Sequence, residues 1–93
     1  MSVDAIAEKI RERVAGSGFD KSVKFDLGAD GVIVVDGQSV STEDAGADCT
    51  ITISKDDFIA LTSGDLSPTM AFMSGKLKVA GDMSIAMQLS QIL

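Results

Sequence analysis

An α+β fold is predicted for this 93-residue chain by the pattern of its apolar residues. These residues recur with a helical period in four segments, and in five others they alternate or run continuously as they do in strands. Hydrophobic residues make up 45% of the chain and charged residues 24%, which is the balance of an ordinary globular protein. A chain this short buries only about 60 to 65% of the surface of its unfolded state. We therefore expect one domain, residues 1–93, with a modest core.

The first expected element is an amphipathic helix over residues 3–14. At 100° per residue, its apolar residues fall within an arc of about 100°, namely Val3, Ile6, Ala7, Ile10 and Val14. Charged residues of both signs occupy the other side, as on a solvated face. Gly16-Ser17-Gly18 follows and ends the helix, because glycine past a helix terminus satisfies its last carbonyls.

Three strands are expected next, as a meander. Residues 22–27 alternate between polar and apolar, which predicts a half-buried strand. A turn at Gly28-Ala29-Asp30-Gly31 leads to a short continuous apolar strand at 32–35. Asp36-Gly37 is then a strong signal for a two-residue hairpin, with the third strand at 38–40.

The next pair of elements is a fourth strand and a second helix. Residues 41–48 form a polar loop, after which residues 49–53 alternate and direct Cys49 into the core. Ser54-Lys55-Asp56-Asp57 resembles a capping box and predicts a helix that ends near Ser63.

The last quarter predicts a short helix, an edge strand and a final helix. Proline is favoured at the first position of a helix, so Ser67-Pro68 begins the short one. The alternating segment 76–79 is the fifth strand, and its two lysines suit an edge that must not pair with another molecule. Gly81-Asp82 then caps the helix at 83–93.

The apolar surface of that final helix is wider than packing on a sheet requires. Ser84, Gln88 and Gln91 form a narrow polar stripe, and the apolar residues spread over an arc of about 220°. Part of that surface must contact further core, a partner chain, a membrane or an apolar ligand. Four of the five methionines also lie in this quarter, and flexible methionines can line a space whose contents vary in shape. Core packing and a ligand cavity are both consistent with these observations.

Composition makes several classes of function improbable. The net charge of −6 is unsuited to a phosphate backbone, so we expect no nucleic-acid partner. The sequence has no His, Trp or Tyr, which removes the commonest general base and the commonest zinc ligand. No apolar run approaches the roughly 20 residues that span a bilayer, and the first residues lack a basic signal segment. We expect a cytoplasmic protein that is no enzyme, has no cofactor or metal, and does not insert stably into membranes.

Three local patterns favour ordinary structure over chemistry. A calcium loop starting at Asp26 would need a ligand at its third position and a glutamate at its twelfth, where the sequence has Gly28 and Gly37. Gly16-Ser17-Gly18 follows a helix and lacks the third glycine of a dinucleotide fingerprint. The acids of the 41–48 loop are expected to be solvated.

Residues 67–89 resemble the sterol carrier protein type 2 family, also called the sterol-binding domain. The segments that carry the resemblance are SPTMAFM from Ser67, GKLKVAGD from Gly75 and MSIAMQL from Met83. The upstream order of helix, meander, strand and helix also agrees. The family's animal members tend to be basic, and longer members continue beyond the last helix, in some cases to a peroxisomal tripeptide. This chain is acidic, and its sequence stops at Gln91-Ile92-Leu93.

The resemblance implies a five-stranded, mostly antiparallel sheet with helices packed on one face and an apolar tunnel between the layers. Such a tunnel takes fatty acids, fatty acyl-CoA, sterols or similar lipids. Carried over position by position, its wall is Phe58, Leu61, Met70, Phe72, Met73, Met83, Ile85, Met87 and Leu89. We expect Val34 and Ile51 to form its floor, with Lys24, Lys76 and Lys78 as candidates to hold a ligand's acidic group at the mouth, although solvated strand faces also explain these lysines.

The leading hypothesis is therefore a non-catalytic lipid carrier. The alternative is a protein-interaction module that covers the same apolar surface with a second copy or with a lipid-handling enzyme.

Overall fold

The computed structural model describes residues 2–92, and the side chains of residues 2–89. Its elements follow the predicted order. They are α1 (Val3–Val14), β1 (Ser22–Asp26), the 3-10 turn η1 (Gly28–Asp30), β2 (Val32–Asp36), β3 (Ser39–Ser41), β4 (Cys49–Ile53), α2 (Lys55–Ser63), α3 (Pro68–Met73), β5 (Leu77–Gly81) and α4 (Met83–Ile92).

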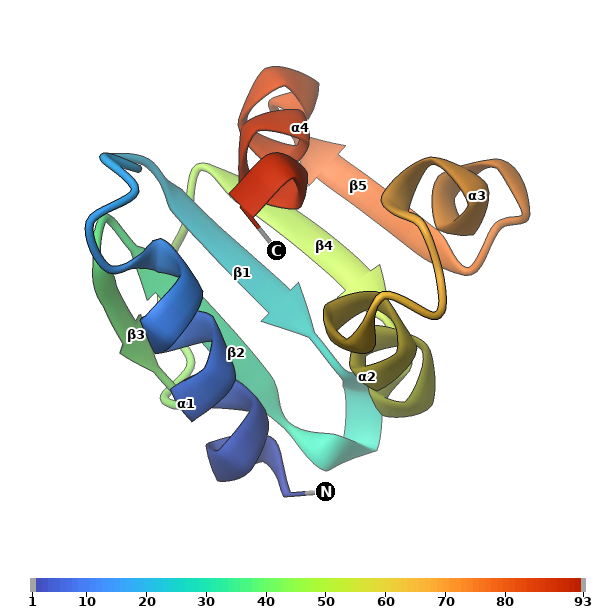
Figure 1. Cartoon of the computed structure of the whole chain (residues 1–93), viewed down its shortest axis with the longest axis horizontal. Coiled ribbons are helices and arrows are strands. Elements are labelled where there is room, and N and C mark those ends of the chain that lie inside the picture. The colour runs from blue at the N-terminus through green and yellow to red at the C-terminus, as the bar shows by residue number, and fades with distance from the viewer. Residues whose placement is uncertain (1, 93) are drawn as a thin grey trace.

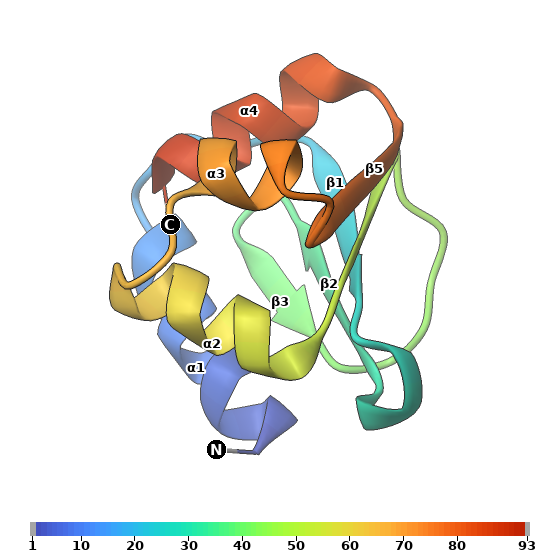
Figure 2. The ribbon, with the colours of Figure 1, turned by 90° about the vertical axis from the view of Figure 1, so that its right-hand side faces the viewer.

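The five strands form one sheet in the order β3-β2-β1-β4-β5, and the four α-helices lie on the same face of it (Figures 1 and 2). All neighbouring strands are antiparallel except β1 and β4, which run parallel. The predicted α+β fold, the meander and the edge position of β5 are thereby confirmed.

The strand register decides which residues face the helices. Val23 pairs with Cys49 and Phe25 with Ile51, so these four buried residues share the covered face. Their neighbours in the alternation point the other way, because successive side chains of a strand project to opposite sides of the sheet. The prediction that Cys49 enters the core is confirmed.

The hairpin between β2 and β3 turns one residue later than predicted. Asp36 pairs with Ser39, so the two turn residues are Gly37 and Gln38. Gly37 has φ +61° and no residue other than glycine has positive φ in the described part of the chain. A turn centred on Asp36-Gly37 would force an aspartate to positive φ, whereas a turn with glycine first avoids that strain.

Each of the last three helices begins at a side-chain cap. Ser54 Oγ accepts a hydrogen bond from Asp57 N at 3.2 Å, and Ser67 Oγ accepts one from Met70 N at 3.1 Å. Asp82 Oδ1 accepts one from Ser84 N at 2.8 Å. These caps satisfy N–H groups that have no partner within their own helix.

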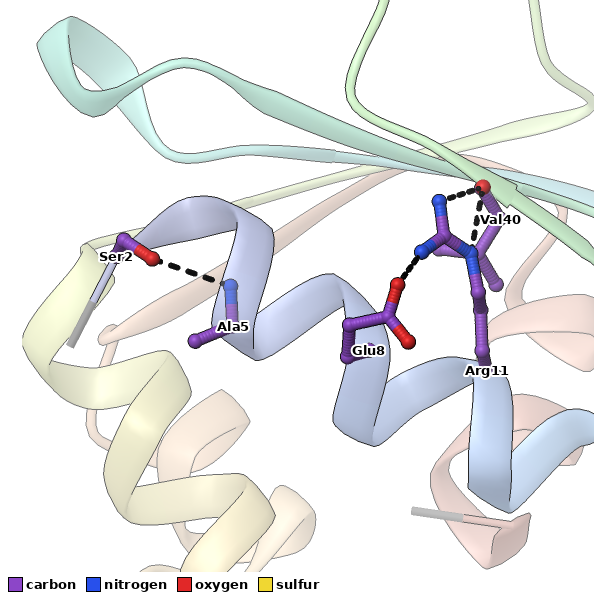
Figure 3. A network of polar contacts seen from close by, with 5 residues as sticks. All are labelled: Ser2, Ala5, Glu8, Arg11 and Val40. Carbon is purple, nitrogen blue, oxygen red and sulfur yellow. Dashed lines mark hydrogen bonds and ion pairs between the residues drawn. The ribbon is translucent and has the colours of Figure 1, made fainter.

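Arg11 joins α1 to the edge strand β3 (Figure 3). Its Nε and Nη2 donate to Val40 O at 3.2 and 2.8 Å, and the guanidinium also contacts Glu8. A carbonyl on an edge strand is open to pairing with another chain, and this contact occupies it. Helix α1 therefore covers the β2–β3 side of the sheet and leaves the β4–β5 side to the other helices.

Burial of Cys49 gives a testable pH dependence. Burial raises the pKa of its thiol above the ordinary value, and the nearby Asp82 carboxylate adds to the effect. The thiol of the unfolded chain therefore loses its proton at a lower pH than the folded one, and the free energy of unfolding declines as the pH rises through the ordinary pKa of a thiol. Denaturant titrations at about pH 7 and pH 9.5 should show this decline, and Cys49→Ala should lack its thiol-dependent part. Equal pH dependence in both proteins would contradict the assignment.

Candidate functional site

A cavity of about 210 Å³ lies between the β1–β4–β5 side of the sheet and helices α2, α3 and α4. Each of these six elements contributes to the wall. The residues that line it are Phe25, Ile51, Ile53, Phe58, Leu61, Pro68, Thr69, Phe72, Leu77, Val79, Met83, Ala86, Met87 and Leu89. Helix α1 contacts β2 and β3, whereas α4 contacts β1, β4 and β5 and the short α3 contacts β5.

The inner part of the cavity is built of buried side chains. Phe25, Ile51, Phe58 and Leu89 are each at most 4% exposed. The rings of Phe25 and Phe58 lie with centroids 4.7 Å apart and planes tilted by 31°. Aromatic pairs of this kind add to the stabilisation that their burial provides, so this end of the cavity has a firm wall.

The outer rim is formed by apolar side chains that remain partly exposed. Phe72 is 48% exposed, Met83 42% and Met87 60%, although all three line the cavity. Helix α4 buries Ile85, Ala86 and Leu89 and directs its two methionines toward the opening. The excess apolar arc of this helix is thereby explained, since one part packs on the core and another borders the cavity.

The wall is almost entirely apolar. Among its described residues, Thr69 carries the only polar side chain and none is charged. Burying a charged or polar group without a partner is unfavourable, whereas apolar surface is stabilised by leaving water. The cavity is therefore suited to the hydrocarbon part of a molecule, whose polar group would stay at the rim.

Most of the residues predicted to bind lipid meet at this cavity. The wall includes Ile51, Phe58, Leu61, Phe72, Met83, Met87 and Leu89. Whether they bind a lipid stays a prediction, but their convergence from four elements is observed.

The remaining four predicted residues lie elsewhere. The prediction for Val34 is wrong, because Val34 pairs with Lys24 and points to the sheet face opposite the cavity. The 42–48 loop passes over that face (Figure 2), and Asp44 there contacts Lys24. Met70 and Met73 are 60 and 76% exposed and are outside the described lining. Ile85 is buried in the core without lining the cavity.

Sequence reasoning missed seven residues of the wall. Phe25 and Ile53 follow from the alternation that placed Ile51 on the covered face, and the same argument reaches Leu77 and Val79. Ala86 lies one turn before Leu89 on α4, so helical spacing could have indicated it. Pro68 and Thr69 carried no comparable signal, because only the packing of α3 beside β5 brings them to the cavity.

The charged candidates do not converge on the rim. Lys24 Nζ lies 2.7 Å from Asp44 Oδ1, and the hydrogen bond to this carboxylate raises the pKa of the Lys24 ammonium. Lys78 pairs with Thr52 on the outer face of the sheet. Asp26 Oδ1 accepts a hydrogen bond from Gly28 N, which is a turn contact.

Within residues 2–92, no three His, Cys, Asp or Glu side chains are placed to hold a metal ion, and no helix is long and apolar enough to cross a bilayer.

The fold and the cavity together define a class of protein, in which a five-stranded mixed sheet and one layer of helices enclose an apolar site. A sequence model of the SCP-2 sterol transfer family matches residues 3–93. The chain belongs to this family.

Three relatives illustrate the match. Sterol carrier protein 2 of Homo sapiens is 45% identical over 56 residues, which are 60% of this chain and 10% of that protein. Hydroxysteroid dehydrogenase-like protein 2 of Bos taurus is 51% identical over 47 residues, 50% of this chain and 11% of that protein. The matched regions thus cover about a tenth of these two relatives.

The third relative is known from two solved structures. The crystal structure of Sterol Carrier Protein 2 Like 2 from Aedes aegypti has a TM-score of 0.83 and 27% identity, and covers 100% of this chain and 97% of its own. The solution structure of palmitated SCP2L2 from Aedes aegypti has a TM-score of 0.74 and 28% identity, over 99% of this chain and 94% of its own. The architecture seen here is therefore shared across almost the whole length of both chains.

Proposed function

We propose that residues 1–93 act as one lipid-binding domain, a non-catalytic intracellular carrier that holds the hydrocarbon chain of a fatty acid, fatty acyl-CoA, sterol or similar lipid. The observation that carries the proposal is the apolar cavity with an exposed apolar rim. Membership of the SCP-2 sterol transfer family and the palmitated relative support it.

Burial of hydrocarbon supplies the affinity in this proposal. Each methylene removed from water stabilises the complex by about 0.8 kcal/mol, less the free energy needed to order the chain. The cavity of about 210 Å³ is smaller than the roughly 300–1,000 Å³ of typical small-molecule sites. A long acyl chain therefore requires α3 and α4 to separate at the rim, or its polar end to project between them. Of the α3 side chains only Ala71 is buried, so this helix is the less firmly held of the two.

Native mass spectrometry combined with a fluorescent fatty acid tests the proposal. Mild desolvation of the purified protein should reveal a monomer with one added mass of a few hundred daltons. Delipidated protein should bind the fluorescent fatty acid with a micromolar dissociation constant, which corresponds to a binding free energy of about −8 kcal/mol. A protein that carries no adduct and binds no fatty acid would falsify the carrier function.

A protein-interaction module is the second candidate, favoured by the exposure of Met70, Phe72 and Met73 on α3. In that case the same spectra should contain an adduct-free dimer or complex. Subcellular fractionation would test the expected cytoplasmic location independently of ligand binding.

A further inference from the structure

The rim of the cavity combines exposed apolar side chains with one hydroxyl group. Phe72, Met83 and Met87 are all partly exposed there, and Thr69, which precedes Phe72 by three residues on α3, is exposed as well. Within the described side chains of residues 2–89, no hydrogen bond joins Thr69 to another residue. Its hydroxyl can donate and accept, so it is available to the polar end of a ligand whose hydrocarbon lies inside.

Two acidic residues flank this rim along the chain. Asp65 precedes the lining residue Pro68 by three positions, so their Cα atoms are at most about 11 Å apart. Asp82 directly precedes Met83 and caps α4 by accepting a hydrogen bond from Ser84 N. At low salt the field of a charge extends over such distances, so both carboxylates act on a group held at the rim.

The two lysines of the last quarter do not offset these acids at the rim. Lys76 and Lys78 line a second hollow, together with Asp26 and Thr52. The pairing of Lys78 with Thr52 places this hollow on the outer face of the sheet, away from the cavity. An ionised head group at the rim would therefore lie near acids and against a wall of apolar side chains.

We infer that the cavity prefers a single-chain lipid with an uncharged polar end, such as an alcohol or an ester, over an ionised fatty acid. This inference rests on the proposed function, because it concerns the head group of the same ligand. An apolar rim removes part of the head group from water, which is more unfavourable for a carboxylate than for a hydroxyl. Repulsion by Asp65 and Asp82 adds to the difference. Thr69 can donate to either kind of head group and so does not reverse it.

Isothermal titration calorimetry with decan-1-ol and decanoate at about pH 8 tests the inference. The two probes have chains of equal length, and the carboxyl group is ionised at that pH. We expect the delipidated chain to bind decanol at least about threefold more tightly than decanoate at low salt. Added salt should narrow this preference, because it screens the repulsion between decanoate and the two acids.

The variant Thr69→Lys places a cation at the rim. It should shift the ratio of the two affinities toward decanoate by about fivefold or more, and the ratio is insensitive to a general loss of stability. The matched control is Thr42→Lys, which makes the same change in the exposed 42–48 loop over the opposite face of the sheet (Figure 2). The control should leave the ratio within about twofold of that of the unmodified chain.

Two results would overturn the preference. They are decanoate binding as tight as decanol binding, and a ratio in Thr69→Lys that does not differ from the ratio in Thr42→Lys. If the chain binds the fluorescent fatty acid but does not prefer decanol, only this inference fails. If it binds neither probe nor the fluorescent fatty acid, the proposed function itself fails.

Discussion

Replacing Ala86 with phenylalanine is expected to weaken fatty acid binding by about 100-fold or more. Ala86 lies on α4, is 8% exposed and lines the cavity. A cavity of about 150 Å³ can hold a benzene molecule, so an added phenyl ring would fill much of the 210 Å³ present here. Displacing about four methylenes of the ligand removes roughly 3 kcal/mol, which is two powers of ten in affinity. Titration with a fluorescent fatty acid measures the change.

Ala80→Phe is the matched control for this substitution. Ala80 is exposed and pairs with Thr50 on β4, on the sheet face away from the cavity. It should leave fatty acid affinity within about twofold of the original. Ligand-free Ala86→Phe should unfold at the same or slightly higher denaturant concentration, because filling a cavity commonly stabilises by about 0.5 to 2 kcal/mol. Undiminished binding by a well-folded Ala86→Phe protein would show that the ligand occupies another place.

Gly81→Ala is expected to destabilise the fold by about 3 kcal/mol or more, or to prevent folding. Gly81 has φ +107°, a conformation that residues with a Cβ rarely adopt. A Cβ there would lie 2.6 Å from Asp48 O and 3.1 Å from Cys49 Cα, both of them backbone atoms. To relieve these close contacts, β5 would have to move away from β4. That movement would break the Cys49–Gly81 pairing and shift the start of α4. Chemical denaturation of the purified variant measures the loss.

Gly28→Ala provides the comparison, because Gly28 has φ +67° but a Cβ there would meet no atom within 4 Å. This substitution should lower the free energy of unfolding by only about 1 to 2 kcal/mol, which is the conformational cost of a Cβ at positive φ. If the two variants lost equal amounts of free energy of unfolding, the close approach of β4 and β5 at Gly81 would make no contribution to the effect of Gly81→Ala.

The elements were predictable because each is determined by residues close together in the chain. The period of Ile6, Ile10 and Val14 requires a helix whatever lies opposite, and the caps at Ser54 and Ser67 act within four residues. The hairpin turn lies one residue later than the Asp36-Gly37 pattern predicts, because Asp36 pairs with Ser39 as the last residue of β2. That pairing makes Gly37 the first turn residue.

The cavity was predictable only in part, because its wall depends on contacts between distant segments. Alternation places Val34 and Ile51 on strand faces, but it cannot say which face the helices cover or that the 42–48 loop covers the other. Similarly, the apolar character of α3 indicated that Met70 and Met73 meet something apolar. The packing of α3 against β5 buries Ala71 and turns both methionines outward.

Local periodicity and capping were sufficient to predict the helices, the strands and the apolar excess of the last quarter. Packing between distant segments places β4 beside β1 in parallel and brings the rings of Phe25 and Phe58 together in the cavity wall. It also places Phe72, Met83 and Met87 at the rim of the cavity and leaves Met70 and Met73 exposed outside its lining. The physical reason is that a side chain's surroundings are set by the segments packed around it, which are far away in the chain and leave no mark in its local pattern.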